Sequence, residues 1–240
     1  MRNLATDAQE IQVFIEKLAR LPVGASSCNF FDHSRPENAV RRRNLQLYLQ
    51  DMLERRPKVL LVGEAPGYRG MRLTGVPFTN RDILQSREGY FGLFGPDKGY
   101  VMPAEATSVA AEPTATVMWD VLAGLDFLPL LWSAYPLHSH QPGRPLSNRA
   151  PSAAEALAGR PFWQELAKLF AVESVVAVGN VGFRSVSASG LSVPKVRHPA
   201  HGGKVKFRDG LQELLAAGMD GGRADPAPRG REPLSRITYT

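Results

Sequence analysis

The sequence predicts an α/β protein, a three-layer α/β/α sandwich around a four-stranded parallel sheet. The first observation is that short apolar runs alternate with longer helix-like stretches along the chain. The second is a composition of 43% apolar and 22% charged residues over 240 residues, which is typical of one soluble globular domain. The predicted strands are 58–62, 128–135, 174–178 and 192–196.

The first predicted helix has one apolar face, because Ile11, Phe14, Ile15 and Leu18 lie three and four positions apart. The next helix repeats this spacing, and the apolar run that follows stops at Gly63, as a short buried parallel strand would. Similar stretches separate the later strands. The predicted helices are 7–20, 37–54, 79–86, 114–124, 152–170 and 207–217.

A single domain is expected to span residues 1–217. Residues 23–36 carry turn formers and are expected to form a loop. Residues 87–112 are rich in Gly, Pro, Ala and Thr, which predicts a loop insertion. Residues 218–240 hold Gly, Pro and Arg without periodicity and are expected to form a flexible basic tail.

Composition limits the chemistry. Cys28 is the only cysteine, so no internal disulfide and no four-thiolate iron–sulfur or zinc site can form. We expect no metal cluster, no cofactor and a reducing, cytoplasmic setting. The N-terminus lacks a signal-peptide core, and no apolar run approaches membrane-spanning length, so no membrane partner is expected.

The net charge is +6, which favours polyanionic partners or serves solubility alone. Arg41, Arg42 and Arg43 leave two readings open, solvated helix surface or phosphate contact. The densest acid-free basic stretch follows the last predicted strand, where glycines and cations near a helix start favour phosphate binding. The expected DNA-binding residues there are Arg197, His201, Gly202, Gly203, Lys204, Lys206 and Arg208.

The first strand runs straight into Gly63-Glu64-Ala65-Pro66-Gly67. Ligands of open α/β sheets sit beyond the carboxyl ends of strands, so this loop is a candidate binding segment. An ordinary turn with a solvated glutamate is the alternative. No Gly-Lys-Ser/Thr follows, which excludes a phosphate-binding loop.

Two further side chains are expected at this edge. Phe78, in Gly75-Val76-Pro77-Phe78, either stacks on a flat ring such as a base or fills the core. His198, held by Pro199 after the last strand, faces the same edge as Glu64 if both strands are parallel. A Glu and a His on parallel strand ends form a candidate catalytic pair.

Together these residues resemble the uracil-DNA glycosylase superfamily over about residues 58–215. Gly63–Gly67 and the Phe78 segment resemble the first motif and base-stacking segment of its thermophile-type branch, and His198-Pro199-Ala200 resembles the second motif. The resemblance implies a four-stranded parallel sheet with DNA at the strand ends. It also implies that His198 hydrogen-bonds the uracil O2, that Glu64 positions a water, and that Phe78 stacks on the flipped base.

Three features depart from that family. The iron–sulfur cysteines of the thermophile-type branch are missing. Ser133 stands where the family carries a base-reading Asn, and a hydroxyl cannot offer the paired pattern of an amide. His201 lies where an apolar wedge is expected. We also place Asn180 among the substrate-binding residues.

The leading hypothesis is a monomeric, metal-free and monofunctional DNA glycosylase. Its partner would be DNA containing a damaged base, uracil or a related deaminated base, as in base excision repair. The alternative is a catalytically weak or inactive nucleic-acid- or base-binding protein of the same fold. A small-molecule hydrolase is less favoured, because the chain has no Gly-x-Ser-x-Gly elbow and no metal-ligand pattern among its five His residues.

Overall fold

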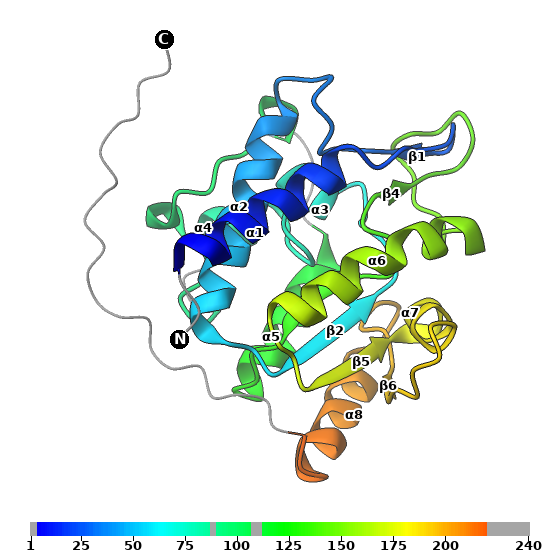
Figure 1. The fold of residues 1–240 in the computed structure, drawn as a ribbon. Helices are drawn as coiled ribbons and strands as arrows, with labels where there is room; N and C mark the ends of the chain where they lie inside the picture. The colour runs from blue at the N-terminus through cyan, green and yellow to red at the C-terminus, as the bar shows by residue number, and fades with distance from the viewer. Residues whose placement is uncertain (1–3, 87–89, 107–111, 220–240) are drawn as a thin grey trace.

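The computed structural model describes residues 4–86, 90–106 and 112–219. A four-stranded parallel sheet lies at its centre, in the order β3-β2-β5-β6 (Figure 1). Its strands are β2 (Val59–Gly63), β3 (Leu130–Ser133), β5 (Ser174–Val178) and β6 (Lys195–Val196). The predicted fold class and all four predicted strands are confirmed, although the second and fourth strands are shorter than expected.

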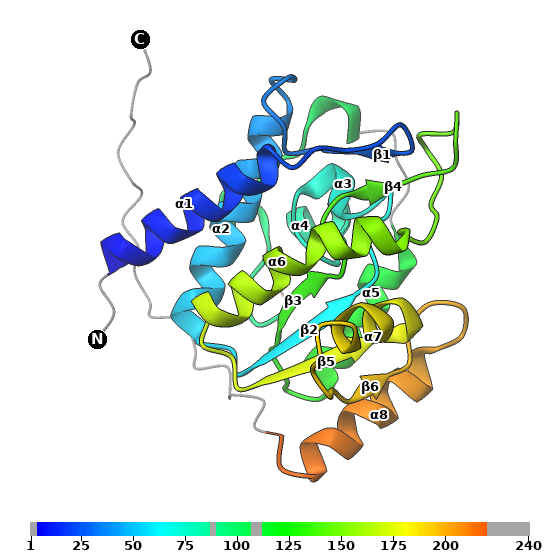
Figure 2. The same cartoon turned by 45° about the vertical axis from the view of Figure 1, so that its right-hand side comes forward.

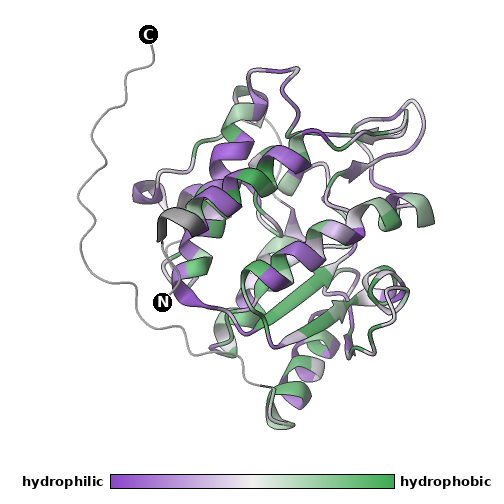
Figure 3. Cartoon of the chain, in the orientation of Figure 1, coloured by the Kyte–Doolittle hydropathy of each residue, from purple (hydrophilic) through white to green (hydrophobic). Residues whose placement is uncertain are grey.

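Helices cover both faces of the sheet, as Figures 1 and 2 show. On one face lie α1 (Leu4–Ala19), α6 (Ala153–Leu169) and α7 (Gly179–Ser187); on the other lie α5 (Pro113–Gly124) and α8 (Lys204–Ala216). Figure 3 shows apolar residues along β2 and β5 at the centre, whereas α1 and α2 alternate between apolar and polar residues. This distribution is that of a sheet buried on both faces between amphipathic helices.

The helix α2 (Asn38–Arg55) lies beside the edge strand β3. The Leu131 N–H donates to the Tyr48 hydroxyl at 3.2 Å, so a buried edge amide has a partner. Arg41 is buried and donates to the Arg72 carbonyl and the Asn38 side chain, both at 2.7 Å. Neither reading of Arg41 was right, because this cation joins α2 to the segment after β2.

Several short elements were not predicted. Residues 23–36 contain β1 (Ser27–Cys28), which pairs antiparallel with β4 (His138–Ser139). A helical turn, α3 (Met71–Thr74), lies before the predicted helix α4 (Arg81–Ser86), and the unpredicted helix α7 directly follows β5. These elements are two to nine residues long, so periodicity over a longer window cannot reveal them.

The described part of the predicted insertion packs against the domain. It contains the 3-10 helices η1 (Pro96–Lys98) and η2 (Ala104–Ala106). Phe94 is buried and meets Trp119 edge to face, with ring centroids 5.0 Å apart. Val101 exchanges two backbone hydrogen bonds with the Asn44 side chain, at 2.7 and 3.0 Å.

Residues 87–89 and 107–111, and residues 220–240 of the predicted tail, lie outside the described residues. No described helix is both long and apolar enough to cross a membrane.

Candidate active site

A cavity of about 320 Å³ opens where the strands of the sheet end. Because β2, β3 and β6 run in parallel, the loops at their carboxyl ends meet at one edge. Eight side chains or backbone segments expected at the site line this cavity: Glu64, Ala65, Pro66, Gly67, Phe78, Ser133, His198 and His201. The sheet edge therefore brings the two sequence motifs and the aromatic segment into one site.

Glu64 has a fixed backbone and a half-buried side chain. The Tyr135 N–H donates to the Glu64 carbonyl at 3.1 Å, which continues the pairing of β2 with β3. Burial raises the pKa of the Glu64 carboxyl, and the positive charge of Arg184 opposes that rise. A carboxyl in this setting accepts a proton more readily than a solvated one, as a general base requires.

Phe78 lies against the end of β2. A side chain at Gly63 would collide with the tip of the Phe78 ring, so the glycine makes this approach possible. Phe78 has a φ of 51°, a strained conformation for a bulky residue, and the Trp119 indole N–H donates to its carbonyl at 2.9 Å. The ring is half-buried: it packs against the core and also lines the cavity, so part of it can meet a ligand.

His198 lines the cavity, and one of its ring nitrogens has a backbone partner. The Ala200 N–H donates to His198 Nδ1 at 3.2 Å, so in the neutral ring the proton lies on Nε2. Burial, with the nearby charges of Arg197 and His201, lowers the pKa of His198. Near neutral pH the residue is therefore an uncharged imidazole that can donate one hydrogen bond from Nε2.

Ser133, the last residue of β3, is buried at the cavity wall with 4% of its surface exposed. Its hydroxyl can make one donor or acceptor contact with a ligand. It cannot make the paired contact that a side-chain amide makes.

The sequence model of the family described as the Uracil DNA glycosylase superfamily matches residues 51–217, well over half of the chain. The chain belongs to the uracil-DNA glycosylase superfamily. None of the curated proteins matches it. The crystal structure of wild-type SMUG2 from Pedobacter heparinus matches with a TM-score of 0.54 and 12% identity, over 88% of this chain and 97% of that one. At this identity the likeness shows the fold.

The iron–sulfur ligands of the thermophile-type branch of this superfamily have no counterpart here. Cys28 is the only cysteine of the chain, and it lies in β1, opposite His138 of β4. Burial raises the pKa of its thiol, which disfavours the thiolate that a metal needs. These residues do not fit such a cluster.

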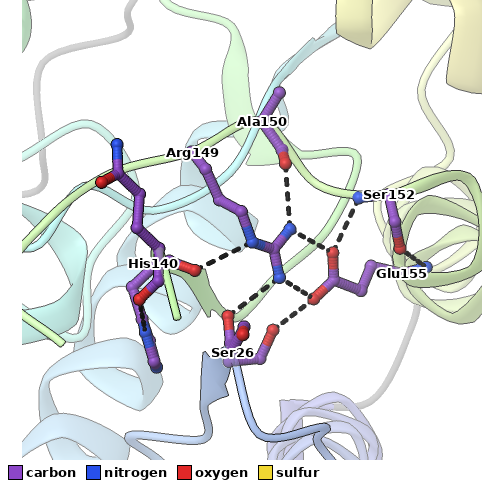
Figure 4. Close-up of polar contacts among 8 residues, drawn as sticks. Ser26, His140, Arg149, Ala150, Ser152 and Glu155 are labelled. Carbon is purple, nitrogen blue, oxygen red and sulfur yellow. Dashed lines mark hydrogen bonds and ion pairs between the residues drawn. The ribbon is translucent and has the colours of Figure 1, made fainter. Parts of the chain in front are cut away.

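One wall of the glycosylase-like cavity is made by Asn148, Arg149 and Ala150, which sequence reasoning missed. Figure 4 shows the Arg149 guanidinium at the centre of a hydrogen-bonded network. It donates to three backbone carbonyls, those of His140 and Ser26 at 2.9 Å and that of Ala150 at 3.0 Å. A single side chain therefore ties this wall to the segment before β1.

The network ends on Glu155, near the start of α6. Arg149 donates to both Glu155 carboxylate oxygens at 2.7 Å, and the Ser27 hydroxyl donates to one of them (Figure 4). Ser152 and Glu155 form a capping box, with the Ser152 N–H donating to the carboxylate at 2.7 Å. Burial raises the pKa of Glu155, but hydrogen bonds from Arg149, Ser27 and Ser152 outweigh it and lower the pKa to about 2.

A second acid in the cavity, Glu112, was also missed. It directly precedes α5, and burial raises the pKa of its carboxyl to about 7, with the charge of Arg69 opposing. The available sequence signal was Glu112-Pro113, an acid next to a helix-starting proline. That signal marks the helix start, but it does not place the carboxyl in a cavity.

The predicted DNA-binding loop lies mostly outside the cavity, which only His201 of this set lines. Arg197, Lys204 and Lys206 are exposed, and Arg208 is exposed and paired with the neighbouring Asp209 at 2.8 Å. Gly202 and Gly203 lead into α8, which begins three residues earlier than expected. Phosphate binding by this surface stays a prediction.

Asn180 is not brought into the cavity. It lies exposed at the start of α7, where its side-chain oxygen accepts a hydrogen bond from Lys195 at 3.3 Å. The fold thus assembles the predicted catalytic and stacking residues but leaves Asn180 outside them.

Proposed function

We propose that the chain is a monofunctional DNA N-glycosylase that removes uracil or a related deaminated base from DNA, acting as a monomer in base excision repair. The observation that carries the proposal is the cavity shared by Glu64, Phe78 and His198, which lie far apart in the sequence. Membership of the uracil-DNA glycosylase superfamily supports it.

The base must leave the duplex before it can enter the cavity, at a cost of about a few kcal/mol for unstacking. Phe78 then offers a face on which the base stacks. Glu64 and a neutral His198 line the same cavity, and we expect one bound base to contact both groups.

Cleavage breaks the bond between C1′ of the sugar and the base nitrogen. The bonding electrons move onto the base, and the Nε2–H of His198 stabilises the charge that develops on its O2 oxygen. The sugar becomes an oxocarbenium ion, to which a water held by Glu64 adds, and the water proton passes to the Glu64 carboxylate. Release of that proton to the base anion gives the neutral free base and returns Glu64 to its carboxylate form.

The direct test uses oligonucleotides carrying uracil, hypoxanthine or xanthine, single- and double-stranded, assayed for strand cleavage after alkali. The His198→Ala variant should lose about 10²–10³-fold in rate, as expected when an oxyanion donor is removed. The matched control is His33→Ala, since His33 is exposed and bonded only to Glu16 on α1 among the described residues. Equal inactivity of wild type and His198→Ala on every base would show the catalytic proposal to be wrong.

The alternative, a protein that holds a base or DNA without cleavage, is favoured by Ser133. A cavity with one hydroxyl in place of an amide binds a base with fewer paired contacts. Turnover on any of the three bases decides between the two functions.

A further inference from the structure

The Glu112 carboxyl lies inside the cavity, over the loop of the first motif. A side chain at Gly67 would place its Cβ 2.7 Å from Glu112 Oε2, and one at Gly70 would collide with the same oxygen. The carboxyl therefore occupies the space that these two glycines leave open. Asn80 holds the Glu112 backbone by donating to its carbonyl at 3.0 Å, and Pro113 begins α5 directly after it.

This carboxyl has no hydrogen-bond or ion-pair partner among the described residues. The side chain is only half-buried and lines the cavity, so the hydrogen bonds that it does not make with the described residues are open to a ligand there.

The surroundings of Glu112 keep a substantial fraction of its carboxyl protonated near neutral pH. Burial raises its pKa to about 7, while the charge of Arg69, on the loop beneath it, opposes the rise. Glu64, Arg149, His198 and His201 face the same cavity. Two carboxyls that share one cavity also resist ionising together.

A protonated carboxyl offers an O–H donor beside a C=O acceptor. Uracil, hypoxanthine and xanthine share a complementary edge, a ring N–H beside a C=O. The Ser133 hydroxyl also lines the cavity, but it supplies only one contact. An ionised carboxylate has acceptors alone and repels the C=O of such an edge.

We propose that Glu112 is the specificity-determining residue of this site and that its carboxylic acid pairs with the N–H and C=O edge of a deaminated base. The inference rests on the proposed function, since it names the group that recognises the base in the same cavity. It makes base recognition dependent on a proton, so binding of the base weakens as the pH rises.

The test measures binding to an oligonucleotide with 2′-fluoro-2′-deoxyuridine, which resists cleavage, and to the same strand with a tetrahydrofuran abasic analogue. Fluorescence anisotropy gives the ratio of the two Kd values between pH 5.5 and 8.5. For the wild type, the preference for the base should fall as the pH rises, approaching about tenfold per pH unit above the Glu112 pKa.

Glu112→Gln keeps a donor and an acceptor and should retain the preference for the base at every pH. In Glu112→Ala this preference should be about tenfold or more weaker at low pH. The matched control is Glu213→Gln, on the exposed side of α8, which should follow the wild type. Thermal melting of each variant establishes that it is folded, and the isosteric Glu112→Gln carries the test if Glu112→Ala does not fold.

A Glu112→Gln profile that coincides with the wild-type profile, or a wild-type preference that does not fall with pH, would overturn the inference. Base release by the same preparations separates the two claims. A pH-dependent preference without release contradicts the proposed function alone, and release with identical pH profiles contradicts the inference alone.

Discussion

Two glutamates, one lining the cavity and one bonded to the cavity residue Arg149, have opposite surroundings. Glu155, behind the wall, accepts hydrogen bonds from Arg149, Ser27 and Ser152, and its pKa is lowered to about 2. Glu112, inside the cavity, has no such partner among the described residues, and its pKa is raised to about 7. The difference separates an acid whose bonds are all made within the protein from an acid whose bonds remain to be made with a ligand.

Glu64 belongs with Glu112 in this comparison, because its half-buried carboxyl also faces the cavity and has a raised pKa. Glu64→Gln should lower the rate of base release by about 10²–10⁴-fold, since the amide cannot accept a proton from water. The free energy of unfolding should stay nearly unchanged. Single-turnover rates and urea unfolding measure the two effects, and a large loss of stability would place Glu64 among the structural acids instead.

Glu155→Ala should instead act mainly on stability. We expect a loss of about 2 kcal/mol in the free energy of unfolding, because the Arg149 guanidinium loses a bidentate partner in a setting that solvent partly screens. The matched control is Glu165→Ala on the same helix, whose exposed pair with Lys17 should contribute at most about 0.5 kcal/mol. Equal losses for the two variants would show that the network does not hold the wall.

The pH dependence of stability should also differ in sign. Because its folded-state pKa is raised, Glu112 contributes stability that is fully present below about pH 4.5 and is lost as the pH rises through 7. Glu155 contributes stability that is present above about pH 4.5 and is lost as the pH falls towards 2.

Urea unfolding between pH 4.5 and 8 can measure the Glu112 part. Over this range the free energy of unfolding of the wild type should fall by about 1–2 kcal/mol relative to that of Glu112→Gln. This is less than the full pKa shift implies, because the side chain is partly exposed. Parallel curves for the two proteins would mean that Glu112 titrates normally.

The smallest expected effect concerns the exposed cations near α8. Lys204→Ala or Lys206→Ala should each reduce the slope of log affinity against log salt by about 1, if each lysine contacts one phosphate. Lys168→Ala is the control, since Lys168 is exposed near the end of α6, just before the strand β5 begins, away from the cavity. An unchanged slope in both variants would remove this surface from the DNA interface.

The sequence predicted the parts of the site that follow from local pattern. A buried run ending at Gly63 and a basic loop after the last strand place Glu64 and His198 at one sheet edge, because parallel strands share that edge. The sequence identified Phe78 as a candidate but could not decide between stacking on a base and filling the core, since this depends on the space above Gly63.

Glu112 and Arg149 could not be predicted in the same way. Glu112 lies in a segment without periodicity, and its place depends on two distant glycines, Gly67 and Gly70. Arg149 reaches the carbonyl of Ser26 and the carboxylate of Glu155, so its role depends on tertiary contacts. For the Arg149 network, the local signal present in the sequence was the capping box of Ser152 and Glu155.

The most direct test of this comparison is an NMR titration of the side-chain carboxyl carbons in protein labelled with ¹³C-glutamate. We predict one carboxyl that titrates near pH 7 and disappears from the spectrum in Glu112→Gln, and one that titrates near pH 2 and disappears in Glu155→Gln. Adding the uncleavable uracil oligonucleotide should raise the pKa of Glu112 further and leave that of Glu155 in place. Ordinary titration of both carboxyls near pH 4.5, with no response to the oligonucleotide, would contradict the different roles of Glu112 and Glu155.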